Sequence, residues 1–184
     1  MYDLSSYRQL SHTNRSFNMD QPVDDQTFNT LVNYIDEFLS ASPFAKKLIL
    51  TDQTYIKTLS NAAIAFPRFE AMQRNSQILA PLVISVYCTQ PYDNNWIHIG
   101  RLYSKLALFA IEQGYHIGFC NGVQYSYLRQ LFTTEQFPFE CRQHTFLSIG
   151  NKLNDDAPHN WSHTTNALIK SYKKSTDEFI QLLN

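Results

Sequence analysis

The clearest pattern in the chain is a stripe of apolar residues at helical spacing between two prolines, Pro22 and Pro43. Its members recur every three or four residues: Phe28, Leu31, Val32, Ile35, Phe38 and Leu39. This spacing predicts an amphipathic helix with one face toward a core. Asp24 and Asp25 stand where the positive end of that helix would be, and Pro43 marks its exit.

A second apolar segment shows no such period. Residues 82–88 read Leu-Val-Ile-Ser-Val-Tyr-Cys, which is β-branched with little alternation. A run of this kind predicts a strand buried on both faces, at the centre of a sheet. Shorter strands are predicted over 47–51 and over 144–149, the latter ending at Gly150.

The stretch from 96 to 122 combines three signals. An apolar-faced helix over 96–113 meets Gly114, a strand-like run follows over 115–119, and a polar turn follows at 120–122. Glycine lacks a Cβ, so such a turn can bring bare backbone close to a flat ligand.

Further helices are expected over 3–10, 54–64, 69–79, 126–132 and 164–183, whereas 151–163 is polar and irregular. Helices and strands mix without strict alternation, which indicates the α+β class with a small central sheet. A length of 184 residues favours a single domain over 1–184.

Composition narrows the function classes. The chain has 15 Lys+Arg and 16 Asp+Glu, and this balance argues against a sequence-independent grip on nucleic acid. No apolar run approaches the ~20 residues of a membrane span, and the first residues lack a signal-peptide pattern. The three cysteines lie far apart, so the expected compartment is the cytoplasm.

The six histidines are scattered without metal-ligand spacing, so no metal site is expected. His98 and His116 are interpreted as structural residues in or beside core elements. The 11 Tyr, 13 Phe and 2 Trp exceed what one core can hold, and some are expected at a pocket or a subunit interface.

A candidate anion site lies in the polar connector 11–17, Ser-His-Thr-Asn-Arg-Ser-Phe. A phosphate needs charge-assisted donors and hydroxyls in a fixed arrangement. Arg15 can donate two parallel hydrogen bonds, Thr13 one, and His12 another if protonated. The alternative is that Arg15 is a surface residue at a helix end and that Thr13 only caps a helix.

At this motif the chain resembles the flavin-dependent nitroreductase family. Members carry a basic–basic–Ser–x–basic–x–Phe signature and then Pro-Val before the second helix. His12, Thr13, Arg15 and Phe17 stand at four of those places, and Ser11 replaces the first basic residue. The likeness spans about residues 3–150, because three further stretches follow in the family's order: Ala80-Pro81 before the buried strand, the helix from Gly100 to Gly114, and Phe146–Gly150.

The resemblance implies a three-layer α/β/α fold with a small mixed or antiparallel sheet, and it implies FMN as cofactor. His12, Thr13 and Arg15 would hold the ribityl phosphate. The turn Phe119, Cys120, Asn121 and Gly122 would face the isoalloxazine ring, with a backbone N–H of Asn121 or Gly122, the catalytic pair, pointing at N5. Asn121 stands where the family often has an acidic residue, and the alternative is an ordinary Asn-Gly turn.

Two more contacts follow from the resemblance. Gln73 would bind the pyrimidine edge of the flavin, although a solvated polar helix face explains it equally well. Ser42 and Pro43 match the start of a stretch that reaches the flavin of the partner subunit in a homodimer. The rest of that stretch is missing here, and of Lys152, His159 and His163 none aligns with the family's basic pair after the last strand.

The resulting first hypothesis is a homodimeric FMN oxidoreductase of nitroreductase type. It would take hydride from NAD(P)H and pass it, in ping-pong fashion, to a small flat acceptor such as a nitroaromatic or a quinone. The C-terminal helix would pack on the partner subunit. The second hypothesis is a binding or scaffold protein with the same fold and weak or no flavin binding. An unrelated α+β domain is a third.

Overall fold

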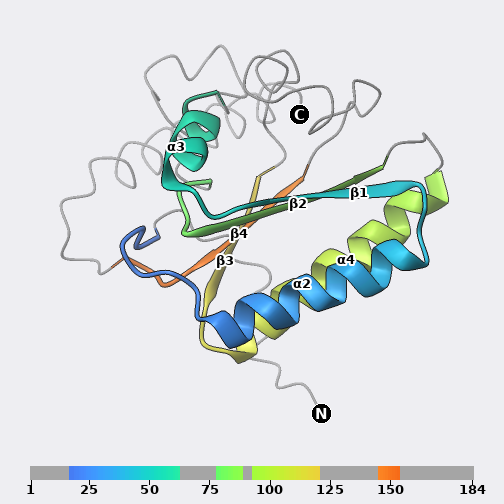
Figure 1. Ribbon diagram of the computed structural model, residues 1–184, viewed down its shortest axis with the longest axis horizontal. Helices are drawn as coiled ribbons and strands as arrows, with labels where there is room; N and C mark the ends of the chain where they lie inside the picture. Colours follow the sequence, from blue (N-terminus) through green and yellow to red (C-terminus); the bar gives the residue numbers. More distant parts are fainter. Residues whose placement is uncertain (1–16, 63–77, 89–92, 121–144, 154–184) are drawn as a thin grey trace, which may run out of the picture. The chain divides into compact units, whose positions relative to one another are not determined.

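The computed structural model describes residues 17–62, 78–88, 93–120 and 145–153 (Figure 1). Every element below belongs to one compact unit, which ends at Lys152. The helices predicted over 3–10, 126–132 and 164–183 lie outside the described residues, as does 69–79 except for its last two residues. Within the described ranges, no helix combines the length and the apolar character that a membrane crossing requires.

The centre of the unit is an antiparallel sheet of four strands. They are β1 (Ala45–Leu50), β2 (Leu82–Cys88), β3 (His116–Cys120) and β4 (Phe146–Gly150), in the order β1-β2-β4-β3. Every residue of β2 is buried, and β2 is an interior strand. The predicted central strand and the predicted α+β class are therefore confirmed.

Helices lie on both faces of this sheet. Figure 1 shows α2 (Asp25–Ser40) and α4 (Asp93–Glu112) on one face and α3 (Gln53–Ala62) on the other. The even-numbered residues of β2 pack with Leu31 and Leu106 of the helical pair. Val83 and Tyr87 pack instead with Ile56 and Leu59 of α3. Two cores separated by one sheet confirm the predicted three-layer arrangement.

The start of α2 is tied to the sheet by Asp24, its N-cap. The carboxylate accepts hydrogen bonds from the Thr27 N–H at 2.8 Å and the Thr27 hydroxyl at 2.7 Å. The Tyr115 hydroxyl, beside β3, donates to the same carboxylate at 2.8 Å. These bonds stabilise the ionised form, above all the one from the Thr27 N–H, and they lower the pKa of Asp24 to about 2.

The helix α4 ends at Glu112, and Gly114 terminates it, as the sequence predicts. Gly114 has φ 86°, a left-handed conformation that only glycine adopts easily. The Tyr115 N–H bonds the Ala110 carbonyl at 3.0 Å and the Gly114 N–H bonds that of Ile111 at 2.9 Å, which is the Schellman pattern. The chain can then reverse directly into β3.

Candidate functional site

The predicted site residues that the structure describes lie at one end of the sheet. Cys120, the last residue of β3, pairs with Phe146, the first of β4. Cys88, the last residue of β2, pairs with Ala45, the first of β1. Ser42 and Pro43 lie in the short connection before β1, so they share this end with Phe119 and Cys120.

Ser42 and Pro43 nevertheless lie far from Phe119 and Cys120 within one chain. They belong to opposite edges of the sheet, since β1 and β3 are its outer strands. Three inter-strand steps separate those edges, or about 14 Å at ~4.8 Å a step. One chain therefore does not bring the two pairs of residues into contact with the same part of a small ligand.

The connection that carries Ser42 and Pro43 is tight. It spans only the four residues 41–44, between α2 and β1. The Ser42 N–H bonds the Leu39 carbonyl at 3.1 Å, and the Ala45 N–H bonds the Ser42 carbonyl at 2.9 Å. Ser42 is buried, whereas Pro43 is exposed. Pro43 is thus available to a ligand or a second chain, and the Ser42 backbone serves the turn.

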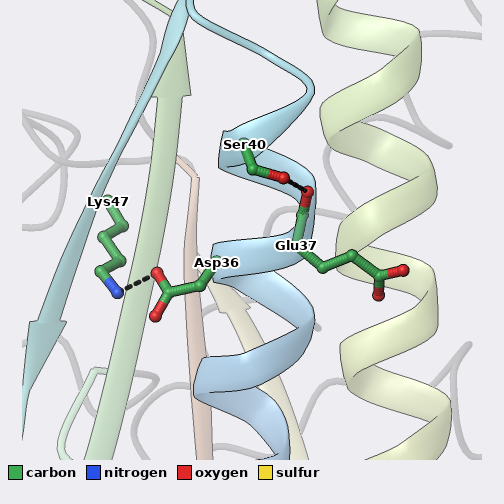
Figure 2. Close-up of polar contacts among 4 residues, drawn as sticks. All are labelled: Asp36, Glu37, Ser40 and Lys47. Atoms are coloured by element: carbon green, nitrogen blue, oxygen red, sulfur yellow. Dashed lines mark hydrogen bonds and ion pairs between the residues drawn. The ribbon is translucent and has the colours of Figure 1, made fainter.

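Polar contacts hold both flanks of this connection (Figure 2). An ion pair joins Lys47 of β1 to Asp36 of α2, and the Ser40 hydroxyl donates to the Glu37 carbonyl at 2.7 Å. The first contact fixes the strand against the helix, and the second satisfies a carbonyl in the last turn of α2. The position of Pro43 is therefore set by regular elements on both sides.

Tyr103 of α4 connects β2, β3 and β4 at the same sheet end. Its hydroxyl accepts a hydrogen bond from the Val86 N–H at 2.8 Å and donates to the Thr145 carbonyl at 2.5 Å. Its ring meets that of Phe119 edge to face, with centroids 6.2 Å apart. Tyr103 thus joins α4, β2, β3 and the residue before β4. The sequence analysis missed it, because a tyrosine on a helical stripe gives no sign of such partners.

Cys120 is a packed residue rather than an accessible one. It is 2% exposed and belongs to the core on the α3 face of the sheet, together with Phe146 and Val83. Burial of this kind favours a structural cysteine over a nucleophile. Only its backbone leads toward the turn 121–122, where Asn121 and Gly122 lie outside the described residues.

The opposite end of the sheet receives the N-terminal segment. Phe17 pairs in antiparallel fashion with Lys152, and the Asn18 N–H bonds the Asn151 carbonyl at 2.9 Å. A Cβ added to Gly150 would lie 2.5 Å from Pro81 Cδ and 3.4 Å from Phe17 Cδ1. Glycine at 150 is therefore what lets Pro81 and Phe17 pack against the end of β4.

His116 opens β3 at this end and lies directly opposite Gly150. It is half-buried, and burial lowers its pKa below 6.5, with a further lowering by the positive charge of Lys152. His98, also expected to be structural, is instead exposed on α4. The reason is that the buried stripe of α4 passes through Ile99 and Leu102.

Two buried hydroxyls on the α3 face have no hydrogen-bond partner among the described residues. They belong to Ser85 of β2 and Ser148 of β4, which are 1% and 0% exposed. A buried hydroxyl without a partner is uncommon, because its desolvation is then uncompensated. Ser148 lies opposite Gly118 of β3.

Two hollows border the described residues. One, of about 670 Å³, lies on the helical layer and is lined by residues such as Tyr34, Arg101 and Phe109. The other, of about 220 Å³, adjoins Pro81 and is lined by Asp20, Thr51 and Gln53. The Asp20 carboxylate makes the smaller hollow unsuitable for a phosphate. Neither includes a predicted site residue.

The remaining predicted site residues lie outside the described ranges. They are His12, Thr13, Arg15, Gln73, Asn121 and Gly122. The structure thus describes four of the predicted contacts, Ser42, Pro43, Phe119 and Cys120. It also describes the sheet ends to which the N-terminal motif and the 121–122 turn are joined.

Comparison with known proteins identifies the fold. Neither the family models nor the curated proteins give a match, but solved structures do. An FMN-dependent nitroreductase from Clostridium difficile R20291 superposes with a TM-score of 0.59 at 16% identity, covering 83% of this chain and 89% of that one. The chain has the nitroreductase fold. The resemblance predicted from the sequence motifs is confirmed at this level.

Two further nitroreductase structures agree. A nitroreductase family protein from Clostridium difficile 630 gives a TM-score of 0.59 at 16% identity, covering 89% of this chain and 92% of that one. Nitroreductase A from Vibrio parahaemolyticus RIMD 2210633 gives 0.59 at 13% identity, covering 84% and 70%. Identities this low establish the nitroreductase fold and leave activity to be argued from residues.

Proposed function

We propose that this chain is an FMN-dependent NAD(P)H oxidoreductase of nitroreductase type. The observation that carries the proposal is the attachment of the N-terminal motif to the end of β4. Phe17 pairs with Lys152, and Arg15 precedes Phe17 by only two residues. Chain connectivity keeps the Cα atoms of Arg15 and Phe17 within about 7 Å. The motif proposed to hold a phosphate thus ends at a residue whose backbone pairs with that of a lysine.

The chemistry of the donor set fits an elongated anion. The segment that carries the proposed phosphate ligands His12, Thr13 and Arg15 leads into Phe17 at one end of the sheet, and the turn proposed to face the ring follows the other end of β3. The five residues of β3 span about 13 Å between those ends, at ~3.3 Å a residue. A cofactor with an anionic tail and a distant flat ring suits that separation.

The residues of this chain would bind and orient, and the flavin would supply hydride transfer at N5 when bound. Arg15 and Thr13 would neutralise and position the phosphate. Gly122, lacking a Cβ, would let the main chain approach the ring, and a backbone N–H of Asn121 or Gly122 would donate toward N5. The Tyr103–Phe119 contact would hold that turn's base rigid. NAD(P)H and a flat acceptor would use the site in turn.

The partner in this proposal is a second copy of the chain. The family resemblance assigns Pro43 to the flavin of the partner subunit, and its exposure and its distance of about 14 Å across the sheet from Phe119 fit that role. Light scattering on the purified protein tests this part. A mass of twice 21.4 kDa is expected, and a monomer at all concentrations would contradict it.

The test of the flavin claim is a titration of the purified protein with FMN, followed by anaerobic addition of NAD(P)H. Flavin fluorescence should be quenched on binding, and the yellow colour should bleach. Arg15→Ala should weaken FMN binding by about 1.5–3 kcal/mol, or roughly 10- to 150-fold. Arg101→Ala is the matched control, because Arg101 is exposed on α4, and it should bind FMN like the wild type.

A second candidate function is a binding or scaffold protein of the same fold. The observation that favours it is the short 41–44 connection, which leaves little chain to reach another subunit. Ser11 at the first basic place of the motif points the same way. A protein that ignores FMN at millimolar concentration, yet stays folded, would replace the oxidoreductase by this alternative.

A further inference from the structure

The smaller hollow, of about 220 Å³, lies where three segments meet at one end of the sheet. One segment precedes α2, one follows β1, and one leads into β2. Leu50 ends β1 and pairs with Val83, while Leu82 begins β2 and pairs with Ile149 of β4. The residues that line the hollow are therefore attached to regular structure at this end of the sheet.

The inner surface of this hollow is mainly apolar. Leu82 is 1% exposed, and the neighbouring Pro81 is buried as well. Val23 and Phe28 line the hollow from the start of α2 and pack on the helical core, whereas Met19 packs on the core of the α3 face. A cavity of about 150 Å³ with apolar walls is large enough for benzene. The hollow thus has room for a small ligand with an apolar body.

The polar part of the lining consists of three exposed residues, Asp20, Thr51 and Gln53. The Gln53 side chain is already in use, because its Nε2 donates to the Met19 carbonyl at 2.9 Å and its Oε1 accepts from Lys57 Nζ at 3.3 Å. Asp20 is the charged residue of the lining, and its carboxylate has neither a hydrogen bond nor an ion pair to another described residue. A carboxylate and a hydroxyl are therefore left to accept hydrogen bonds from a ligand.

The two helices that start beside the hollow do not turn it into an anion site. Unbonded N–H groups at a helix N-terminus attract anions. Here Asp24 accepts the Thr27 N–H at 2.8 Å at the start of α2, and Asp52 accepts the Thr54 N–H at 2.7 Å at the start of α3. A metal ion is not favoured either, because the described residues contain no group of three His, Cys, Asp or Glu side chains that could hold one.

We propose that this hollow binds a small primary amine in its ammonium form, with an apolar group of about the size of a benzene ring. The ammonium would donate to the Asp20 carboxylate and the Thr51 hydroxyl, and the apolar group would lie against Leu82 and Phe28. A cation that carries an apolar group matches both parts of the lining. The site contains no residue of the proposed flavin site, so the two proposals are tested separately.

The first experiment compares three probes of similar shape and different charge: benzylammonium, benzyl alcohol and benzoate. Each is titrated at pH 7 and constant ionic strength into protein with labelled methyl groups, and the resonances of Val23 and Leu82 are followed. Benzylammonium should give saturable shifts with an affinity about 3- to 10-fold higher than that of benzyl alcohol, and benzoate should bind most weakly. Equal affinities for the three probes, or no saturable shift at these methyl groups, would overturn the proposal.

The second experiment replaces the carboxylate. Asp20→Asn should bring the affinities for benzylammonium and benzyl alcohol to within about 2-fold of each other. The matched control is Asp25→Asn, because Asp25 is exposed in the first turn of α2 and does not line the hollow. This control should keep the preference for benzylammonium. Equal loss of the preference in both variants would show that the general negative charge of this region attracts the probe, and the proposed contact with Asp20 would be wrong.

The design does not depend on either variant being stable. Both replaced carboxylates are exposed, so the variants should fold like the wild type, and circular dichroism checks this. The comparison of the three probes uses the wild-type chain alone and can overturn the proposal by itself. A protein that shows no affinity for FMN should still prefer benzylammonium, since the hollow is formed without the flavin.

Discussion

Two glycine-to-alanine substitutions should change stability in opposite directions. At Gly150, a new Cβ would lie 2.5 Å from Pro81 Cδ and 2.8 Å from Pro81 Cγ. Favourable carbon–carbon contacts lie near 3.5–4.0 Å. A proline ring is closed onto its own backbone and cannot rotate aside, so the start of β2 or the Phe17 segment must shift. At Gly100 in α4, a new Cβ would have no neighbour within 4 Å.

The magnitudes follow from these surroundings. Overpacking of a well-filled site costs about 1–3 kcal/mol. Alanine recovers about 0.4–1 kcal/mol by restricting the unfolded chain, so Gly150→Ala should lower the free energy of unfolding by about 1–2 kcal/mol. Gly100→Ala has no steric cost and replaces glycine inside a helix, so it should raise the free energy of unfolding by about 0.5–1 kcal/mol.

Urea unfolding monitored by circular dichroism measures both changes. With a urea dependence of about 2 kcal/mol per molar, the midpoint should fall by roughly 0.5–1 M for Gly150→Ala and rise by about 0.3–0.5 M for Gly100→Ala. Gly150→Ala should also bind FMN more weakly, since Phe17 leads into the proposed phosphate motif. If Gly150→Ala is as stable as the wild type, the packing of Pro81 on β4 has been misread.

Four further predictions concern stability. Tyr103→Phe should lower the free energy of unfolding in urea by about 1–3 kcal/mol, because it leaves the buried Val86 N–H without its acceptor. The same change at half-exposed Tyr55 should cost under about 0.5 kcal/mol, and equal effects would refute the hydrogen bond assigned to Tyr103. The pKa of Asp24 is lowered to about 2 from 3.8, so the stability that its carboxylate contributes is present above about pH 4 and lost as the pH falls toward 2. When unfolding is followed in an acid titration, Asp24→Asn should abolish this part of the pH dependence of stability. Lys47→Ala should lower the free energy of unfolding, measured by thermal melting, by under about 1 kcal/mol, because the ion pair to Asp36 is half-exposed. A larger loss would show that this ion pair is shielded from water. Ser148→Ala should be neutral or stabilising in the same melt, because it removes a buried hydroxyl without a described partner; a clear loss of stability would reveal a partner outside the described residues.

The sequence predicted those features of the fold that local patterns encode. The apolar stripe from Phe28 to Leu39 sets the buried face of α2, and the unbroken apolar run of β2 places it inside the sheet. Gly114 terminates α4 because its φ of 86° suits glycine. These features need no knowledge of distant residues.

Other features leave no mark in the local apolar pattern and could not be predicted. The helix α4 begins at Asp93, three residues before the predicted Trp96, because its first turn is polar and adds nothing to the apolar stripe. The order β1-β2-β4-β3 places the last strand between two earlier ones. The hydrogen bonds of Tyr103 to β2 and to the residue before β4 follow from that order.

The candidate site, like the fold, could be predicted from the sequence only in part. Motif order led from the sequence to the nitroreductase fold, because the residue types around Arg15 and Gly150 occur in the family's sequence. The relation of Pro43 to Phe119 needed the strand order, which separates them across the sheet. The side chain of Cys120 belongs to the core, as expected of a cysteine without a histidine or asparagine at a recognisable local spacing, whereas its assignment to a ligand-facing turn stays a prediction.

The central claim is that this nitroreductase-fold chain binds FMN and exchanges electrons through it. Equilibrium titration of the flavin-free protein with FMN, followed by anaerobic NAD(P)H, measures that claim directly. Saturable quenching of flavin fluorescence at one FMN per chain, and bleaching of the bound flavin on reduction, is the predicted result. A folded protein that leaves FMN fluorescence unchanged up to millimolar concentration would contradict it.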